Sequence, residues 1–489
     1  MNSENSQTKW GQFISLVTVF FFWGFVGSAN DILIPVFKKV FTLSQVQSQL
    51  VAWAFYAAYF VGSLIFFLVS LKSDVLQRFG YKKTLAAGLM LSAFGSFLFV
   101  PAATMQSFPF FLTALFTVGL GFSIQQIVAN PLAIKMGSPV TGAHRLTLAG
   151  GVNSFGTTIG AILLGIALFG MGDNKNTTLS LEDIKLPFII LGLAFILVAI
   201  FMLLSKIEDP VKEEEAKIED GHKNFSIMDY PQLYLGMLAI FIYVGTEVTI
   251  ISNLPALLHT REFGNILEEA IPPFIALYWG SLMIGRWNGG VNVFNTSKMV
   301  NTALKFIVPA LAFGVIIFAN IFAQHDVSAF YIYPVWILIF IFVSFIGGKN
   351  AGKTLMLYGI SGLLMMLIGL VCPDKEIAMF FFISGGLFLS IMWPSIFDLA
   401  IAGLGKNTGK ASSFLIMMIL GGGIIPLIQG GICDIDLSNP EGIMGISWTH
   451  FSYIVPLLGF AYLGFYGFYC PRILKKQGVF HVETEGGGH

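Results

Sequence analysis

Long apolar stretches separated by short polar segments run through almost the whole chain of 489 residues. A helix that crosses about 30 Å of hydrocarbon needs about 20 mostly apolar residues, because lipid offers no partner for an exposed backbone group. The first half contains six stretches of this length: 13–35, 50–71, 84–104, 108–134, 146–170 and 186–205. The second half contains eight: 233–258, 271–294, 306–322, 327–348, 354–372, 377–403, 411–432 and 448–470. The pattern predicts an all-α membrane protein with 14 transmembrane helices.

A division into two halves is indicated by the longest polar stretch and by short motifs that recur in order on either side of it. Gly62-Ser63-Leu64 is echoed by Gly280-Ser281-Leu282, and the segment 136–142 is echoed by 404–409. Such weak internal similarity is typical of membrane transport proteins built from two related repeats. We therefore expect six-helix bundles at 1–205 and 231–476, a cytoplasmic linker at 206–230, and one inserted helical hairpin at about 301–348. The tail at 477–489 is expected to derive in part from an expression vector.

Composition and charge support a membrane protein and predict its orientation. The chain is 55% hydrophobic and 11% charged, whereas soluble domains carry about 25% charged residues. The formal net charge is zero, so no basic field points to a nucleic acid partner. If the amino terminus is cytoplasmic, 21 of the 27 Lys and Arg lie on the cytoplasmic side, as the positive-inside rule requires. We expect both termini in the cytoplasm, a location in a bacterial inner membrane, and a protein that acts as a monomer.

No cofactor or resident metal is expected from the motifs. Residues 347–354 satisfy the P-loop pattern G-x-x-x-x-G-K-[ST], but that motif needs a strand before it and a helix after it in a soluble α/β domain. Both flanks here are predicted membrane spans, so we exclude nucleotide binding. Cys372, Cys433 and Cys470 form no C-x-x-C pair and are interpreted as free thiols.

Two carboxylates deep in predicted spans are candidates for function, because an ionisable group at bilayer depth is costly unless it faces a partner or a cavity. Asp31 lies in the first span, where a proton or a metal cation could neutralise it, although it could also pair with Lys38 or Lys39. Glu247 lies near the middle of its span. It could face a substrate cavity, or it could be a buried glutamate that fixes two helices together. We assign Asp31 to cation coupling and Glu247 to substrate binding.

A third carboxylate, Asp398, lies about one turn from the predicted cytoplasmic end of its span. There Arg286 or Lys406 could pair with it, so a structural role is favoured over contact with a substrate. Charged residues at the cytoplasmic ends are expected to form conformational latches. The predicted latch residues are Asp74, Arg78, Arg145, Arg286 and Asp398.

Neutral polar residues within the spans are typical of a sugar site, because a sugar needs directed hydrogen bonds and an aromatic face. Gln126 and Asn130 are four residues apart and share a helix face. Trp393 could be a stacking platform or an ordinary lipid-facing aromatic. Hydrogen bonds between helices are an alternative role for Gln125, Asn153 and Asn253. The predicted substrate-binding residues are Gln125, Gln126, Asn130, Asn153, Glu247, Asn253 and Trp393.

Several strings in both halves form a recognisable set: Asn30-Asp31-Ile32-Leu33-Ile34-Pro35, Ala129-Asn130-Pro131, Asn153-Ser154-Phe155-Gly156, Gly285-Arg286-Trp287 and Ser390-Ile391-Met392-Trp393-Pro394-Ser395-Ile396-Phe397. Together they resemble the major facilitator superfamily, in particular its fucose permease and glucose/galactose transporter branch. The resemblance covers nearly the whole chain. It implies two bundles that give alternating access to a central sugar site, and it places the family's membrane carboxylate of the first helix at Asp31.

One departure from the fucose permease pattern bears on the coupling ion. That pattern has a second carboxylate in the fourth helix, and the matching position here is Gln126, which cannot take up a proton. In the seventh helix, Glu247 matches the glucose/galactose branch. A single carboxylate among amide and hydroxyl oxygens suits Na⁺, a hard cation that prefers oxygen ligands. The sequence therefore favours Na⁺ slightly over H⁺, with Asp31 as the possible Na⁺ ligand.

The resulting hypothesis is cation-coupled uptake of a hexose such as glucose, galactose, fucose or N-acetylglucosamine. A drug/proton antiporter with 14 spans is one alternative, but it would need a wide apolar cavity in place of the amide cluster. An uncoupled sugar facilitator is another. A membrane enzyme is not expected, because the sequence has no nucleophile motif, no His/Asp cluster with metal-ligand spacing and no large domain outside the membrane.

Overall fold

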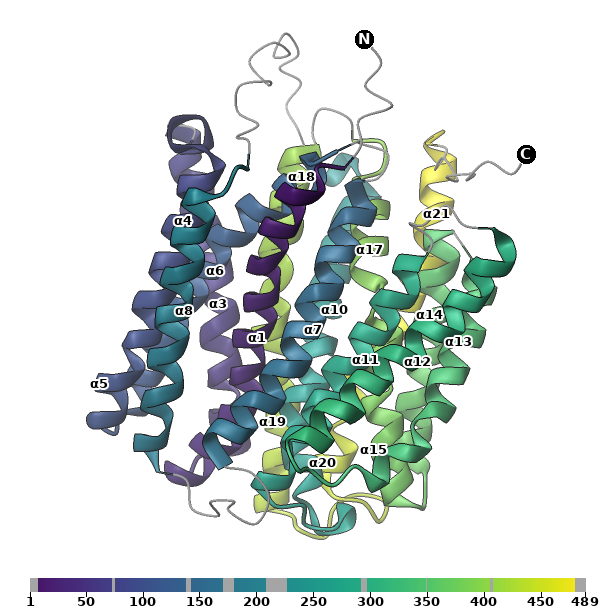
Figure 1. The fold of residues 1–489 in the computed structure, drawn as a ribbon. Helices are drawn as coiled ribbons and strands as arrows, with labels where there is room; N and C mark the ends of the chain where they lie inside the picture. The colour runs from purple at the N-terminus through teal and green to yellow at the C-terminus, as the bar shows by residue number, and fades with distance from the viewer. Residues whose placement is uncertain are drawn as a thin grey trace.

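The computed structural model describes residues 8–72, 75–137, 142–169, 180–207, 227–291, 297–348, 350–404 and 408–479, apart from a few side chains within these ranges, that of Asp31 among them. The described residues form helices and no β-strand, with one isolated bridge between Ile443 and Ile446. The main helices of the first half are α1 (Trp10–Val40), α3 (Leu50–Lys72), α4 (Val75–Phe97), α6 (Phe108–Lys135), α7 (Gly142–Phe169) and α8 (Lys185–Leu204) (Figure 1).

Among the described residues of the second half, eight long helices or helix runs are found. They are α10 (Pro231–Leu258), α11 (Pro272–Gly290), α12 (Lys298–Phe322), α13 (Pro334–Gly347), α14 (Ala351–Val371), the run of α15 (Lys375–Ile383), α16 (Gly385–Leu389) and α17 (Met392–Ile401), the run of α18 (Thr408–Met417), η11 (Met418–Leu420) and α19 (Gly421–Cys433), and α21 (Ile454–Lys476). Short elements join them: α2 (Gln45–Ser48), α5 (Phe99–Thr104), η12 (Asp434–Leu437) and α20 (Trp448–Phe451).

The predicted all-α membrane fold is confirmed. Within the described residues, 13 helices or helix runs are long and apolar enough to cross a membrane. Each coincides with a predicted span. The remaining predicted span, 271–294, is also helical over α11, which carries Arg286, Trp287 and Asn288 near its end.

The two halves repeat the same packing scheme. In the first half α1 packs on α7, α3 on α6, and α4 on α8. In the second half α10 packs on α19, α11 on α16, and α14 on α21. This correspondence makes α14 the counterpart of α4 and leaves α12 and α13 without counterparts. They form the inserted hairpin that the sequence predicts.

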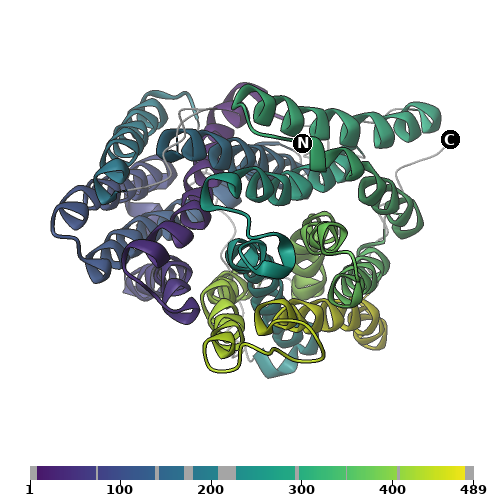
Figure 2. The same ribbon diagram turned by 90° about the horizontal axis from the view of Figure 1, so that it is seen from below.

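The inserted hairpin lies at the outer edge of the second half (Figures 1 and 2). α12 packs against α11, and α13 packs against α14. Of its 25 residues, α12 buries only Pro309, Ala312, Ile316 and Asn320, which recur every three or four positions and form one narrow stripe. In the connection to α13, Asp326 accepts a hydrogen bond of 2.8 Å from the backbone N–H of Ser328, which lowers the pKa of the Asp326 carboxyl.

The two ends of the molecule can be distinguished by the helices that begin or end there. α1 begins and α21 ends at the same end, which we call the terminal face; α2 and α20 lie at the opposite end, which we call the distal face (Figure 1). Seen from below, the first half occupies one side of the molecule and the second half the other (Figure 2). The contacts between halves run mainly along α7 with α11 and along α2 and α3 with α19.

A hydrogen-bonded cluster closes the distal face between the halves. The carboxylate of Asp434 accepts bonds from the backbone N–H groups of Gln45 and Val46, at 2.6 and 2.8 Å. The side chain of Gln45 donates to Asn253 Oδ1 at 2.8 Å, and that of Gln49 donates to the same oxygen at 3.2 Å. Gln45, Val46 and Gln49 belong to the first half and Asp434 and Asn253 to the second, so these bonds join the two halves at the distal face.

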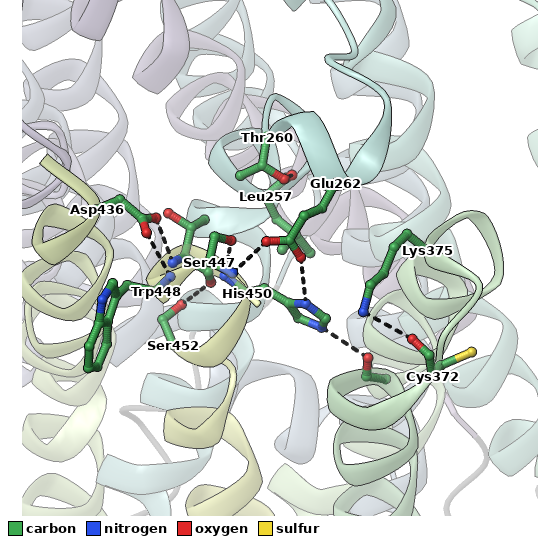
Figure 3. A network of polar contacts seen from close by, with 12 residues as sticks. Leu257, Thr260, Glu262, Cys372, Lys375, Asp436, Ser447, Trp448, His450 and Ser452 are labelled. Atoms are coloured by element: carbon green, nitrogen blue, oxygen red, sulfur yellow. Dashed lines mark hydrogen bonds and ion pairs between the residues drawn. The ribbon is translucent and has the colours of Figure 1, made fainter. Parts of the chain in front are cut away.

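A second polar network at the distal face lies wholly within the second half (Figure 3). Glu262 accepts a hydrogen bond from the backbone N–H of Ser447 and lies 3.1 Å from Nδ1 of His450. The other ring nitrogen of His450 is 3.1 Å from the carbonyl oxygen of Gly369. Asp436 accepts bonds from the N–H groups at the start of α20. The network joins the connection between α10 and α11 and the connection between α19 and α20 to the last turn of α14.

Candidate functional site

A cavity of about 370 Å³ lies between the two halves, within the range of small-molecule sites. Residues of α1, α3, α6, α7, α10, α11 and α17 line it. It extends from Ile251 and Ser252 in α10 to Leu146 and Ile401, which lie near the terminal ends of α7 and α17. The distal cluster therefore closes one end of the passage, and the cavity reaches toward the other.

Three of the predicted amide side chains line this cavity. Gln126 donates to the hydroxyl of Tyr59 at 3.1 Å, and Asn153 donates to the carbonyl oxygen of Phe20 at 3.0 Å. Asn130 makes no hydrogen bond to the described residues. Each amide thus keeps unused donors or acceptors toward the cavity. Asn153 is held close because α7 approaches α1 at Gly24, where a Cβ would lie 1.9 Å from the Asn153 carbonyl oxygen.

Glu247 and Arg286 form an ion pair on the cavity wall. Oε2 of Glu247 is 3.8 Å from Nη2 of Arg286 and accepts a hydrogen bond from the hydroxyl of Tyr243. The hydroxyl of Tyr278 donates to the backbone carbonyl of Glu247 at 2.7 Å. The side chains of Glu247 and Arg286 are 14% and 17% exposed, so each offsets the other's charge in a largely desolvated place.

Aromatic rings form much of the remaining wall. Trp393 lines the cavity beside Tyr243, with ring centroids 6.0 Å apart at 57°. Tyr56 and Tyr59 stack at 6.2 Å on the opposite half. Trp393 reaches this position because the helix run breaks between α16 and α17, where Ile391 is non-helical and Pro394 follows. These rings provide an apolar stacking surface beside the amides.

Two predicted substrate-binding residues lie away from the cavity wall. Gln125 is fully buried between helices, where it accepts a hydrogen bond from Trp23 Nε1 at 2.7 Å and donates to Ser92 Oγ at 2.9 Å. Asn253 is fully buried in the distal cluster and donates to Gln429 at 2.9 Å. Both take the alternative role that the sequence left open, hydrogen bonding between helices, because each side chain points toward a neighbouring helix.

The predicted latch residues are dispersed in the structure. Arg78 is exposed, with its guanidinium 5.3 Å from the ring of Phe79. Arg145 is buried, and its Nε donates to the carbonyl oxygen of Ala133 at 3.0 Å. Arg286 and Asp398 line the cavity. Asp74, and the side chain of Asp31 assigned to cation coupling, lie outside the described part of the structure.

The sequence reasoning missed the partners that hold Glu247. Tyr243 is one helical turn before Glu247, so the i, i+4 spacing could have identified it. The sequence offers Arg286 or Lys406 as a partner for Asp398 and does not indicate that Arg286 pairs with Glu247. Its approach to Glu247 depends on how α10 and α11 pack, which spacing along one helix does not reveal.

Comparison with known proteins shows to which family this architecture belongs. The profile of the Major Facilitator Superfamily matches residues 13–427. A glucose/galactose transporter of Brucella abortus biovar 1 (strain 9-941) is 33% identical over 464 residues, which cover 95% of each chain. An L-fucose-proton symporter of Escherichia coli (strain K12) is 27% identical over 442 residues, 86% of each chain. The crystal structure of the transporter FucP in the outward conformation aligns with a TM-score of 0.62 at 22% identity, covering 94% of this chain and 98% of that one.

Two helical bundles around a central cavity, together with a family model and transporter relatives that align over nearly the whole chain, identify an integral membrane transporter rather than an enzyme. The chain belongs to the Major Facilitator Superfamily. The resemblance found in the sequence is thereby confirmed.

Proposed function

We propose that the protein is a secondary active transporter that takes up a hexose together with a cation, by alternating access of the central cavity. The observation that carries this proposal is the composition of the cavity wall. Amides of Gln126, Asn130 and Asn153 and the ion pair of Glu247 with Arg286 face it alongside Trp393. Directed hydrogen bonds plus an aromatic face match a neutral polyol better than an apolar drug.

The printed functions of the relatives support the substrate class. Proteins named as glucose/galactose transporters align over nearly their whole length with this chain, and so do two L-fucose-proton symporters. These sugars share a pyranose ring with several hydroxyl groups. A hexose is therefore the proposed cargo, and glucose, galactose and fucose are the first to test.

Asp31 is the proposed site of cation coupling. The name of the fucose relatives favours H⁺. The replacement of a carboxylate by Gln126 favours Na⁺, since it removes a second group that could carry a proton. Either ion would neutralise a carboxylate at bilayer depth, and that neutralisation would make reorientation of the loaded protein less costly.

The proposed direction follows from the expectation that both termini are cytoplasmic. With this orientation the terminal face is cytoplasmic, and the structure, closed at the distal face, corresponds to the inward-facing part of the cycle. Binding of sugar and ion from outside would require the distal cluster of Asp434, Gln45 and Asn253 to separate. Reclosure of the cluster would then follow occupation of the cavity, since a ligand shifts a conformational equilibrium through its differential affinity.

The test is uptake of labelled glucose, galactose and fucose into proteoliposomes with Na⁺ and pH gradients imposed separately. Accumulation above equilibrium with one gradient alone identifies the coupling ion. Counterflow without accumulation under either gradient identifies a facilitator. Absence of both binding and counterflow for all three sugars overturns the proposal, and sugar-independent proton flux with an apolar cation would instead identify a drug antiporter.

A further inference from the structure

Arg286 lies where the cavity wall meets the contact between α7 of the first half and α11 of the second, which we call the α7–α11 seam. Its Nη1 donates to Ser154 Oγ at 2.6 Å and to the carbonyl oxygen of Gly150 at 3.3 Å, both on α7 of the first half. Its Nε donates to the carbonyl oxygen of Ser390 at 3.2 Å, and its Nη2 faces Glu247 on α10. One guanidinium therefore contacts three segments that belong to different halves.

The local sequence explains how Arg286 reaches these partners. Pro394 has no N–H, so the carbonyl of Ser390, four residues earlier, lacks its helical donor and can accept from Arg286 instead. Gly285 allows the close approach, because a Cβ at this position would lie 2.0 Å from the hydroxyl oxygen of Ser390. The Trp-Pro break that positions Trp393 thus also anchors the guanidinium.

The contact with Glu247 differs from the other contacts of Arg286. At 3.8 Å, Nη2 and Oε2 attract each other but are too far apart for a hydrogen bond. Oε2 is already bonded to Tyr243, and Oε1 of Glu247 makes no hydrogen bond to the described residues. The Tyr243 hydroxyl interacts with both Glu247 and Arg286, and beside it Oε1 remains as an acceptor and Nη2 as a donor for a ligand. A hydroxyl group, which donates and accepts at once, is the complementary ligand.

We propose that Arg286 is a positioning residue that couples sugar binding at Glu247 to the α7–α11 seam. A sugar hydroxyl that bridges Nη2 and the Glu247 carboxylate draws the guanidinium toward α10. Because the guanidinium is planar and rigid, Nη1 moves with Nη2 and its bond to Ser154 weakens. This role rests on the proposed sugar transport and specifies how occupancy of the cavity reaches the first half.

The neighbouring residue, Trp287, makes a second contact across the α7–α11 seam, and it does not line the cavity. Trp287 donates through Nε1 to the carbonyl oxygen of Gly151 at 3.3 Å, and its ring lies against Phe155 with centroids 6.4 Å apart. The halves thus stay in register at Trp287 while Arg286 changes partners. Ser154 itself does not line the cavity, so its hydroxyl can be removed without touching the sugar site.

The test separates affinity from turnover in the full-length protein. Equilibrium binding of the transported hexose is measured in detergent, and counterflow of the same sugar is measured in proteoliposomes. The variants are Ser154→Ala and Arg286→Lys, with Ser96→Ala as the matched control. Ser96 is likewise a fully buried helical serine, bonded to the carbonyl oxygen of Ser92 at 2.9 Å and remote from the seam.

We expect Ser154→Ala to keep the dissociation constant within about twofold while counterflow slows about tenfold, a change of about 1.4 kcal/mol in the barrier. Arg286→Lys should weaken binding about tenfold and also slow counterflow, because Lys keeps the charge but lacks the fork. Ser96→Ala should change neither. Wild-type counterflow in Ser154→Ala, wild-type behaviour of Arg286→Lys, or parallel loss of affinity and rate in Ser154→Ala overturns the positioning role. Failure of the wild-type protein to bind or exchange any of the three hexoses overturns the proposed function instead.

Discussion

Asn130 faces the cavity with an amide that bonds to none of the described residues. A bound sugar would provide the first hydrogen-bond partner of this amide, whereas Gln126 and Asn153 each already donate one hydrogen bond within the protein. We expect Asn130→Ala to raise the dissociation constant of the sugar about tenfold, since one hydrogen bond contributes about 1 kcal/mol or slightly more. Equilibrium binding of labelled hexose measures the change.

A matched control for that substitution is Asn320→Ala in α12. Asn320 is fully buried and bonded to the carbonyl oxygen of Ile316 at 2.9 Å, far from the cavity wall. Its loss should lower thermal stability and leave sugar affinity unchanged. Equal affinities for the Asn130 variant and the wild type would remove Asn130 from the proposed site.

Asp31 carries the proposed coupling, and Asp31→Asn makes that assignment testable. Asparagine is neutral in every state of the cycle, so the variant resembles a permanently protonated or ion-loaded protein. We expect it to lose accumulation against a gradient completely while retaining counterflow of the same sugar. The measurement is uptake into proteoliposomes with and without an imposed ion gradient. Accumulation by the variant at the wild-type level contradicts coupling at Asp31.

The sequence predicts which polar residues lie within the membrane spans, but it does not predict which of them face the cavity. Gln125 and Gln126 are neighbours in an apolar span, and nothing in the sequence indicates which of them faces the cavity. In a membrane protein both the lipid-facing and the packed sides are apolar, so hydrophobic periodicity orients a helix poorly. In the structure Gln126 lines the cavity, whereas Gln125 is hydrogen-bonded to Trp23 and Ser92.

At the scale of elements, closure of the distal face depends on the contact between α2 and the end of α19. The two carboxylate oxygens of Asp434 accept hydrogen bonds from two backbone N–H groups of the other half. An asparagine has only one side-chain oxygen and no negative charge, so it would keep one of these bonds, and that bond would be weaker. We expect Asp434→Asn to increase the distal-open population about tenfold. The readout is the rate at which a membrane-impermeant maleimide modifies Cys433, which is 4% exposed beside this cluster, after Cys372 and Cys470 are replaced by serine.

Asp374→Asn provides the control at the same face. Asp374 also accepts a backbone N–H, that of Ile377 at 3.2 Å, but donor and acceptor belong to one half. Its replacement should leave the labelling rate of Cys433 unchanged. An equal increase for both variants would indicate loosening of the distal face in general, against a specific role of Asp434 in closure.

Element boundaries were predictable where a span is continuous and failed where it breaks. The predicted span 108–134 nearly coincides with α6, Phe108–Lys135. The predicted span 377–403 is instead divided into α15, α16 and α17, and Trp393 lies just after the second division. Pro394 signalled a break, but the freed carbonyl of Ser390 and its partner Arg286 could be recognised only from the packing of α11 against α16.

For the whole molecule, sidedness in the membrane can be tested with a native cysteine. Cys372 ends α14 at the distal face and is half-buried, whereas Cys433 and Cys470 are buried. If the termini are cytoplasmic, a membrane-impermeant maleimide should label Cys372 in intact cells. In Cys372→Ser, labelling should fall to the slow rate of the buried Cys433. Modification of Cys372 only after the cells are permeabilised would reverse the orientation.

The hairpin of α12 and α13 makes the two halves unequal in their surroundings. Its exposed apolar side chains, such as Phe306, Leu311 and Phe318, add surface for lipid on the second half alone. When two bodies turn against each other in a viscous sheet, the one with the smaller drag turns further. We therefore expect the second half to rotate less relative to the bilayer during transport, and the first half, which carries Asp31, to rotate more.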